Sequence, residues 1–407
     1  MLKKYWKLIM FSLIICFATS LYFINLYGPI QRIPTYGINT IFGDGSLIKD
    51  VHIRAFVENK KDYSGQSLVN IDQNKNEKEG LLPFYKRFDD GYSDLDYMRR
   101  VKDYRSFMRL KSVNDYSSET DKYLAYVDYE HRWNWYNYST LKLDVLDKET
   151  GQSQRISIDL KKELDLKDSS IESIMLVGDL AYITISSYIY DLLAEEEDGY
   201  YEHTNEGYDY YLISVDLQAG DIVQTDMLAS LHGDDYWEDE YYIVSLPDQS
   251  KGDRAIIGLM KRTYEENTME STAETAGLRY VTAKGIIQGK LPLNDGSEEP
   301  LLLYDGELIL GSLTESGANF KLVDLETGEV ILMKTYNGLY LDIGTFEASK
   351  DKVIYFSGRK DIDSNDTTIF GLKADTLELI YEGELKTDHK RASEYDIYIY
   401  DLQVKQK

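Results

Sequence analysis

The sequence predicts an all-β chain, a β-propeller of about six or seven four-stranded blades preceded by one N-terminal transmembrane helix. Three observations lead to this prediction. A charge-free apolar stretch lies near the N-terminus, and two strand-and-turn motifs recur in step along the rest of the chain. Tyrosine, which favours strands, is abundant at 36 residues. At 407 residues the chain is long for one core, so either a repeat array or two to three domains is expected.

Residues 8–27 contain no charged side chain. Twenty residues of α-helix rise about 30 Å, which is roughly the thickness of one hydrocarbon core. Lys3, Lys4 and Lys7 precede the stretch, so the positive-inside rule places residues 1–7 in the cytoplasm. The sequence therefore predicts a single-pass protein of the cell membrane, anchored by residues 8–27, with residues 28–407 as an extracytoplasmic domain.

Two other interpretations of this stretch compete with an uncleaved anchor. Residues 18–20 (Ala-Thr-Ser) resemble a signal-peptide cleavage site, but the apolar run continues past them. Cys16 would allow a lipoprotein, although Ile15 stands where such signals carry a small residue. Because Cys16 is the only cysteine, the external part has no disulfide and no cysteine-ligated zinc site.

The first recurring motif is a hairpin, KLVDLETGEVI at residues 321–331. Related segments are LDVLDKETGQSQ (143–154), LISVDLQAGDIV (212–223) and a looser FGLKADTLELI (370–380), in which Thr376 stands where the others have Gly. The glycine supplies the positive φ of a hairpin turn, and the aspartate before it can bond its own backbone.

The second motif is a turn aspartate followed by a strongly apolar run of strand length. It begins at Asp121, Asp179, Asp253, Asp305 and Asp351, with a sixth copy at Asp50. A buried strand, a strand ending in the first motif and an outer strand thus follow one another repeatedly, in units of about 45–75 residues, which is the size of a propeller blade.

These motifs predict six units between Asp50 and about residue 385. A seventh could lie in residues 81–118, whose second half is basic, and this region is otherwise expected to be a partly helical insertion, helical around 94–110. The alternating strand 395–404 is expected to pair near residues 36–42, which would close the ring and leave no free edge.

The VDLETGEV and VDLQAGDI turns resemble the Ala-x-Asp-x-x-Thr-Gly-x-x-x-Trp repeat of quinoprotein-like (PQQ-type) β-propellers, over most of residues 120–385. The tryptophan of that repeat falls on Arg155, Gln224 and Leu332, so its docking residues are absent. The resemblance implies the propeller architecture and the general use of such propellers as extracytoplasmic scaffolds and binding modules. It implies no quinone cofactor.

Charge and motifs narrow the function classes. The formal net charge of −26 repels nucleic acids, so they are not expected partners. The five histidines are scattered, and no HExxH, G-x-S-x-G, P-loop or G-x-G-x-x-G motif is present. We expect a non-catalytic binding or scaffold module for an extracellular protein, peptide or cell-wall component. The alternative is an extracytoplasmic hydrolase or lyase with its site in the central funnel.

Two aromatic stretches are candidate ligand sites. HRWNWYNY places Trp133 and Trp135 on one strand face and Tyr136 on the other, either as a stacking platform or as packing between blades. Tyr236 and Trp237 lie in the acidic stretch HGDDYWEDEYY. Together with residues 194–211, this acidic stretch would form either an acidic aromatic surface for a cationic partner or two solvated loops.

One segment has the opening pattern of a calcium loop. Asp361, Asp363 and Asn365 alternate in DIDSND, but Asp366 and Leu372 replace the glycine and glutamate that an EF-hand requires. Either a shorter calcium site or a plain polar turn is expected there, and calcium is the one cofactor that the sequence suggests.

Overall fold

The computed structural model describes most of the chain in separate stretches. These are residues 10, 11, 13, 15–21, 36–60, 67–71, 76–78, 95–111, 116–129, 140–164, 166, 169–192, 203–232, 240–250, 252–264, 271–287, 299–314, 317–325, 327–349, 351–360, 367–387 and 395–404. Residues 15–21 are helical, and no helix in the described stretches is both long and apolar enough to cross a membrane. The chain divides into two compact units, Asp94–Asn337 and Met1–Ser93 with Gly338–Lys407.

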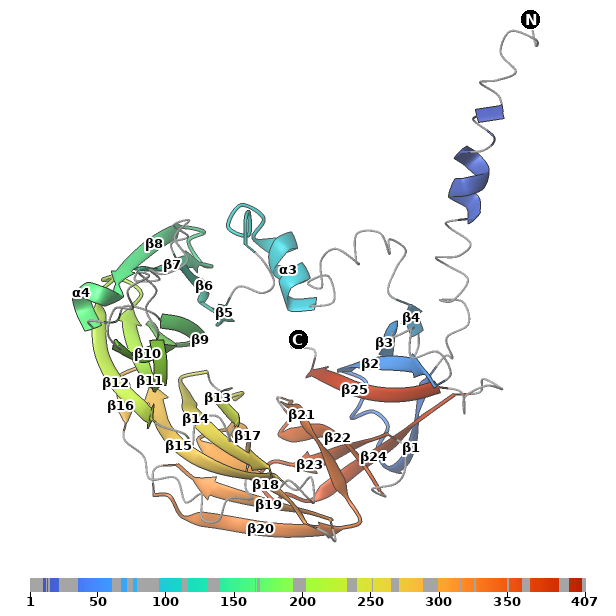
Figure 1. Ribbon diagram of the computed structural model, residues 1–407. Coiled ribbons are helices and arrows are strands. Elements are labelled where there is room, and N and C mark those ends of the chain that lie inside the picture. Colours follow the sequence, from blue (N-terminus) through green and yellow to red (C-terminus); the bar gives the residue numbers. More distant parts are fainter. Residues whose placement is uncertain are drawn as a thin grey trace, which may run out of the picture. The chain divides into compact units, whose positions relative to one another are not determined.

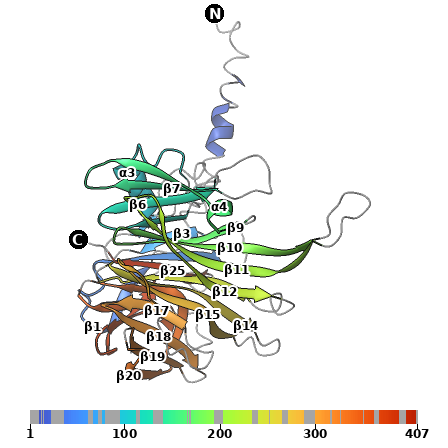
Figure 2. The ribbon, with the colours of Figure 1, turned by 90° about the vertical axis from the view of Figure 1, so that its left-hand side faces the viewer.

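The unit Asp94–Asn337 contains four antiparallel sheets, each with its four strands in chain order (Figure 1). The first consists of β5 (Tyr116–Glu119), β6 (Tyr123–Tyr129), β7 (Thr140–Asp147) and β8 (Ser153–Asp159). The second consists of β9 (Ser169–Val177), β10 (Leu180–Leu192), β11 (His203–Asp216) and β12 (Ile222–His232). The third consists of β13 (Glu240–Pro247), β14 (Arg254–Tyr264), β15 (Ser271–Thr282) and β16 (Gly285–Ile287). The fourth consists of β17 (Glu299–Tyr304), β18 (Glu307–Thr314), β19 (Gly317–Asp324) and β20 (Val330–Asn337). Figure 2 shows the long β10 and β11 reaching beyond the neighbouring strands.

Consecutive sheets of this unit pack face to face, because alternate residues of each strand point to opposite faces. On β10, Ala181 and Ile183 enter the core shared with the β5–β8 sheet. Leu180 and Tyr182 enter the core shared with the β13–β16 sheet, where the Tyr182 hydroxyl donates to the Thr282 carbonyl at 2.7 Å. A third core joins the β13–β16 and β17–β20 sheets. Such serial packing of four-stranded sheets is consistent with propeller blades.

The other unit contains two sheets that combine strands from both ends of the chain. One is ordered β25 (Tyr395–Val404), β2 (Val51–Asn59), β3 (Ser67–Ile71) and β4 (Asn76–Lys78). The second is ordered β1 (Gly37–Gly43), β24 (Leu379–Lys386), β23 (Thr368–Lys373), β22 (Val353–Arg359) and β21 (Tyr340–Ala348). Residues of both sheets share one core.

The predicted partner of strand 395–404 is wrong. That strand, β25, pairs with β2, so that Val404 lies opposite Val51, whereas β1 pairs with β24. The reason is burial. Apolar residues of β2 such as Ile53 and Ala55 are fully buried and need a strand on either side, whereas β1 is mostly exposed and suits an edge.

The aspartate series correctly predicts one buried strand of every described sheet. β2, β6, β10, β14, β18 and β22 each begin within two residues of a series aspartate, and each is an interior strand. The prediction of a nearly all-β chain with four-stranded antiparallel sheets is therefore confirmed. By contrast, the described residues 95–111 contain α3 (Leu95–Asp103) and no strand of a seventh sheet. The helix expected around 94–110 is thus present as α3, whereas the alternative of a seventh unit in residues 81–118 falls partly outside the described residues and stays a prediction. A short α4 (Leu160–Leu164) follows β8.

The glycine turns also form as predicted. In the hairpin between β19 and β20, Asp324 Oδ1 accepts a bond from Thr327 N at 2.8 Å, and Gly328 has a φ of 74°. The looser copy differs from its predicted alignment, because the positive φ of 50° belongs to Leu377 and not to Thr376. Leu377 N donates to Lys373 O, and the fully buried side chain gives packing that offsets the strained backbone.

Candidate functional site

The predicted site residues lie outside the described part of the chain. They are Trp133, Trp135, Tyr136, Tyr236 and Trp237 as ligand-binding candidates, and Asp361, Asp363 and Asn365 as calcium ligands. These assignments stay predictions. Within the described stretches, no three His, Cys, Asp or Glu side chains gather in a way that could hold a metal ion.

One part of the predicted acidic aromatic surface is described, on β11. The ring centroids of Tyr188 and Tyr208 lie 4.3 Å apart, and those of Tyr208 and Tyr210 lie 6.3 Å apart. Tyr210 is buried, and Tyr208 packs against the core shared with the β13–β16 sheet. Burial and nearby Glu172 raise the pKa of Tyr210 above its usual range. Tyr208 and Tyr210 therefore pack between two sheets, whereas Tyr188 of β10 is 38% exposed.

A different site is built by residues 95–111, here called the α3 segment. Its Phe107 and Met108 are buried against Leu124, Tyr126 and Leu146 of the β5–β8 sheet. Residues 123, 125 and 127 of β6 point to the core shared with the β9–β12 sheet, so the α3 segment covers the opposite face. The rings of Phe107 and Tyr126 meet edge to face at 6.0 Å between centroids.

Glu119, on β5, ties the α3 segment to this sheet. Its carboxylate accepts hydrogen bonds from Arg99 at 2.6 Å, from Arg100 at 2.8 Å and from Lys148 at 2.9 Å. The Glu119 side chain is only 9% exposed. Burial alone would raise its pKa, but the bonds from Arg99, Lys148 and Arg100 outweigh burial and lower the pKa to about 2.

Lys111 fixes the other end of the α3 segment. Its ammonium lies 2.8 Å from Asp144 Oδ2 and 4.4 Å from the centre of the Phe107 ring. The Tyr97 hydroxyl donates to the Lys111 carbonyl at 2.9 Å, so the beginning of α3 is bonded to the end of the segment. Burial opposes ionisation of Asp144, but hydrogen bonds from Arg155 and Lys111 outweigh it and lower the Asp144 pKa.

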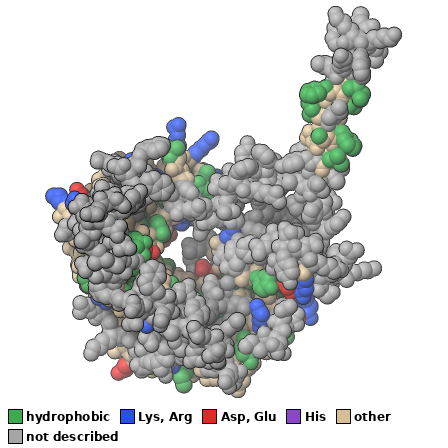
Figure 3. Space-filling view, in the orientation of Figure 1, with side chains coloured by type: hydrophobic (Ala, Val, Ile, Leu, Met, Phe, Trp, Pro, Cys, Tyr) green, Lys and Arg blue, Asp and Glu red, His purple; other side chains and the backbone are tan. Residues whose placement is uncertain are grey.

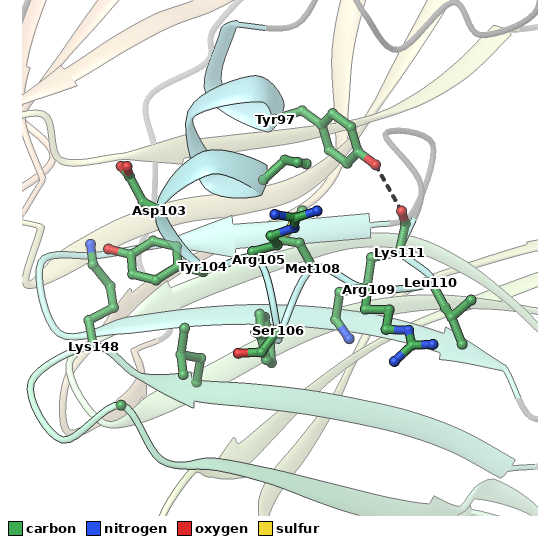
Figure 4. Close-up of a pocket in the computed structure, with 14 residues that line it drawn as sticks. Tyr97, Asp103, Tyr104, Arg105, Ser106, Met108, Arg109, Leu110, Lys111 and Lys148 are labelled. Atoms are coloured by element: carbon green, nitrogen blue, oxygen red, sulfur yellow. Dashed lines mark hydrogen bonds between the residues drawn. The ribbon is translucent and has the colours of Figure 1, made fainter.

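Between these two attachments lies an open pocket of about 1010 Å³ (Figure 4). The α3 segment supplies most of the lining, and Leu146, Lys148 and Gly151 supply the rest. Residues 95–111 hold six basic and two acidic side chains, a net +4 in a chain of −26. Lys111 and Lys148 are paired with carboxylates, whereas Arg105 and Arg109 are exposed and form no ion pair with a described residue. The pocket therefore presents two arginines that can bind an anionic group.

The sequence shows the basic character of this region but does not predict the pocket. The pocket depends on Glu119 and Asp144, which belong to strands of the following sheet. The useful signal was the run of basic residues at 99–111 within a strongly acidic chain.

Comparison with known proteins gives fold-level likeness only. No protein-family model matches the chain, and no curated protein matches it. An uncharacterized protein from Listeria monocytogenes is similar at 8% identity and a TM-score of 0.33, covering 65% of this chain and 63% of that one. The Dos1 propeller has 14% identity, a TM-score of 0.29 and coverages of 59% and 67%. TolB from Acinetobacter baumannii has 11% identity, a TM-score of 0.29 and coverages of 84% and 65%.

This chain therefore spans less than two thirds of the length of the Listeria and Acinetobacter proteins. Because every one of these TM-scores is below 0.5, the fold assignment rests on the sheets and their packing. The quinoprotein-like resemblance stays a prediction. The described chain is a series of antiparallel sheets, five with four strands and one with five, and it carries a basic pocket at the α3 segment.

Proposed function

We propose that this protein is a membrane-anchored, extracytoplasmic binding module of propeller architecture. It binds anionic groups of a protein, peptide or cell-wall ligand at the pocket beside α3. The observation that carries the proposal is the pair Arg105 and Arg109, exposed and without an ion pair to any described residue.

The lack of a described carboxylate partner for Arg105 and Arg109 is informative because acidic residues outnumber basic ones in the chain. The chain has 71 acidic and 45 basic residues, so an exposed arginine has many potential carboxylate partners. The neighbouring Arg99, Arg100 and Lys111 are paired in this way. An unpaired guanidinium keeps its full set of donors for a carboxylate or phosphate, which it can bind through two parallel hydrogen bonds.

The pocket favours binding over chemistry. Its volume of about 1010 Å³ is close to the upper end of the range for small-molecule sites, about 300–1,000 Å³. No histidine or cysteine is among its lining residues, and two of its four cations are held by carboxylates of the β5–β8 sheet. Such a frame offers positioned donors for an anion, and Asp103 is the one carboxylate among its lining residues.

The test uses the full-length chain in non-ionic detergent micelles. Fluorescence anisotropy measures the binding of two labelled probes, a glutamate-rich peptide and a glycerol-phosphate oligomer, across a range of salt concentrations. We expect binding that weakens with salt. The double variant Arg105→Gln/Arg109→Gln should weaken it at least about tenfold, because a charge-assisted bond is worth about 1.5–3 kcal/mol.

The matched control removes two positive charges elsewhere in the same unit. Lys161→Gln/Lys162→Gln lies on α4, where both side chains are exposed. Its binding should equal that of the unmodified protein. The proposal is overturned if neither probe binds at low salt, or if both double variants weaken binding equally, since binding would then depend on net charge alone.

A further inference from the structure

Leu110 is the most exposed of the large hydrophobic residues in the described stretches, at 97%. It follows Arg109 at the rim of the basic pocket (Figure 4). Its φ is 70°, in the left-handed region that a leucine rarely adopts. Two unfavourable features, strained backbone and complete exposure of an apolar side chain, therefore meet at one residue.

The other described non-glycine residues with positive φ have a local explanation. Asp305 and Lys352 are polar residues in turns, and Leu377 is completely buried. Leu110 also lies in a turn, but its side chain is neither polar nor buried. Strain that persists without a packing reason points to a functional constraint.

The surrounding structure holds Leu110 in place. Met108 is buried, the Lys111 amide donates to the Met108 carbonyl at 3.1 Å, and the Lys111 side chain is paired with Asp144. The projecting leucine thus lies between a buried methionine two residues before it and an ion-paired lysine directly after it. Figure 3 shows Lys and Arg side chains projecting from the surface at the top of the view, over the α3 segment.

We propose that Arg105, Arg109 and Leu110 form a docking surface for an anionic lipid bilayer. The two guanidinium groups contact lipid phosphates, and the Leu110 side chain enters the boundary between headgroups and acyl chains. This is the arrangement of an interfacial anchor, in which basic side chains flank an apolar one. The inference rests on the proposed function, because it uses the same two arginines.

A bilayer fits this surface better than a soluble anionic polymer does. A soluble polymer could pair with the arginines but would leave Leu110 in water, whereas a bilayer accommodates both. The charge outside residues 95–111 is −30 (−26 − 4), which an anionic bilayer repels. The basic surface is therefore the face that can approach, so the charge distribution also fixes the orientation of docking.

The experiment places an environment-sensitive NBD label at Leu110. The full-length variant Cys16→Ser/Leu110→Cys is labelled and reconstituted into vesicles of phosphatidylcholine alone, or of phosphatidylcholine with phosphatidylglycerol. A blue-shifted emission, quenched by nitroxides on the acyl chains, is expected only with phosphatidylglycerol. The matched control is Cys16→Ser/Lys284→Cys, labelled at the exposed turn between β15 and β16 of the same unit, which should show neither effect.

Adding Arg105→Gln and Arg109→Gln to the labelled protein tests the role of charge. Each basic residue near an anionic surface is worth about fivefold in binding, so the ratio of docked to undocked protein should fall about 25-fold. Equal emission in the two lipid mixtures overturns the proposal, as does quenching that survives the arginine substitutions. A blue shift that appears only when an acidic peptide is added would assign Leu110 to a protein partner instead.

The two proposals fail separately. If Leu110 stays in water in both lipids while the soluble probes still bind, the docking surface is refuted and the binding module stands. If Leu110 enters the lipid while neither soluble probe binds, docking stands and the soluble ligand is refuted.

Discussion

The Asp248 carboxylate accepts a hydrogen bond from the backbone of Gly306, with 2.9 Å between Asp248 Oδ2 and Gly306 N. Asp248 follows β13 and Gly306 precedes β18, so the bond joins two consecutive sheets. Asp248 Oδ1 also accepts from Asp305 N at 3.1 Å and from Ser250 N at 2.9 Å. The Asp248 side chain has no exposed surface, so its bonds replace all of its hydration.

We expect Asp248→Ala to lower the free energy of unfolding by about 2–3 kcal/mol. The substitution leaves the Gly306 amide without its acceptor and removes one of the two acceptors of the Asp305 amide, in a partly buried site. Chemical denaturation measures the change. Asp253→Ala is the control, because that side chain is 52% exposed and should change stability by no more than about 0.5 kcal/mol. Equal effects would show that Asp248 does not join the sheets.

Glu119 should make attachment of the α3 segment depend on pH. Its pKa is about 2 in the folded protein, against about 4.3 for an ordinary glutamate. The folded state therefore binds fewer protons, so the stabilisation is complete above about pH 4.5 and is lost as pH falls toward 2. We expect it to be worth roughly 2 kcal/mol, allowing for solvent around the exposed Arg99.

Thermal unfolding of the unmodified protein and of Glu119→Gln across a pH series measures this effect. The difference between the two should be large at neutral pH and should shrink below about pH 4.5. Glu163→Gln is the control, because its partner Lys162 is 77% exposed and the pair contributes little. A pH-independent difference for Glu119→Gln would contradict the assignment.

Leu110 and Leu377 share a left-handed backbone but should respond oppositely to asparagine, which tolerates that conformation. Leu110→Asn relieves strain without loss of packing, so we expect a gain of about 0.5–1 kcal/mol. Leu377→Asn removes a fully buried side chain and should cost about 3 kcal/mol. Urea denaturation of both variants provides the measurement. A loss of stability in Leu110→Asn would mean that its side chain is packed.

Pairing of the C-terminal strand should be essential to its unit. Leu402 of β25 is 3% exposed and lies opposite Ile53 of β2. We expect Leu402→Ala to destabilise the protein by about 2–4 kcal/mol, as is typical of a core leucine. On the same strand, Tyr398 is 44% exposed, so Tyr398→Ala should have a much smaller effect. Differential scanning calorimetry compares the two, and similar losses would argue against the core role of Leu402.

The sequence predicts the interior strands well because their signal is local. Asp179 and the apolar run after it are adjacent in the chain, and so are the turn and flanking strands around Gly328. The sequence does not predict the partner of strand 395–404, because an alternating strand carries no information about which edge it joins. Burial of β2 decides that, and burial depends on residues far away in the chain.

The candidate site was less predictable for the same reason. The basic residues at 99–111 are visible in the sequence, but which of them are paired depends on Glu119 and Asp144. Nothing local distinguishes Arg100, which is bound to Glu119, from Arg105, which lines the pocket. Leu377 illustrates a similar limit, since a leucine takes the conformation that three related turns give to glycine.

The pairing of β25 with β2 has a consequence for how the protein is made. Val51 and Val404 are 353 positions apart, and closing a loop of that length costs about 5 kcal/mol of chain entropy. The unit Asp94–Asn337, whose strands pair with their immediate neighbours in the chain, can assemble while synthesis continues. The other unit needs the last strand to leave the ribosome. Until then β2 lacks its partner, so we expect its open edge to be the part of the nascent chain most exposed to aggregation and most in need of a chaperone.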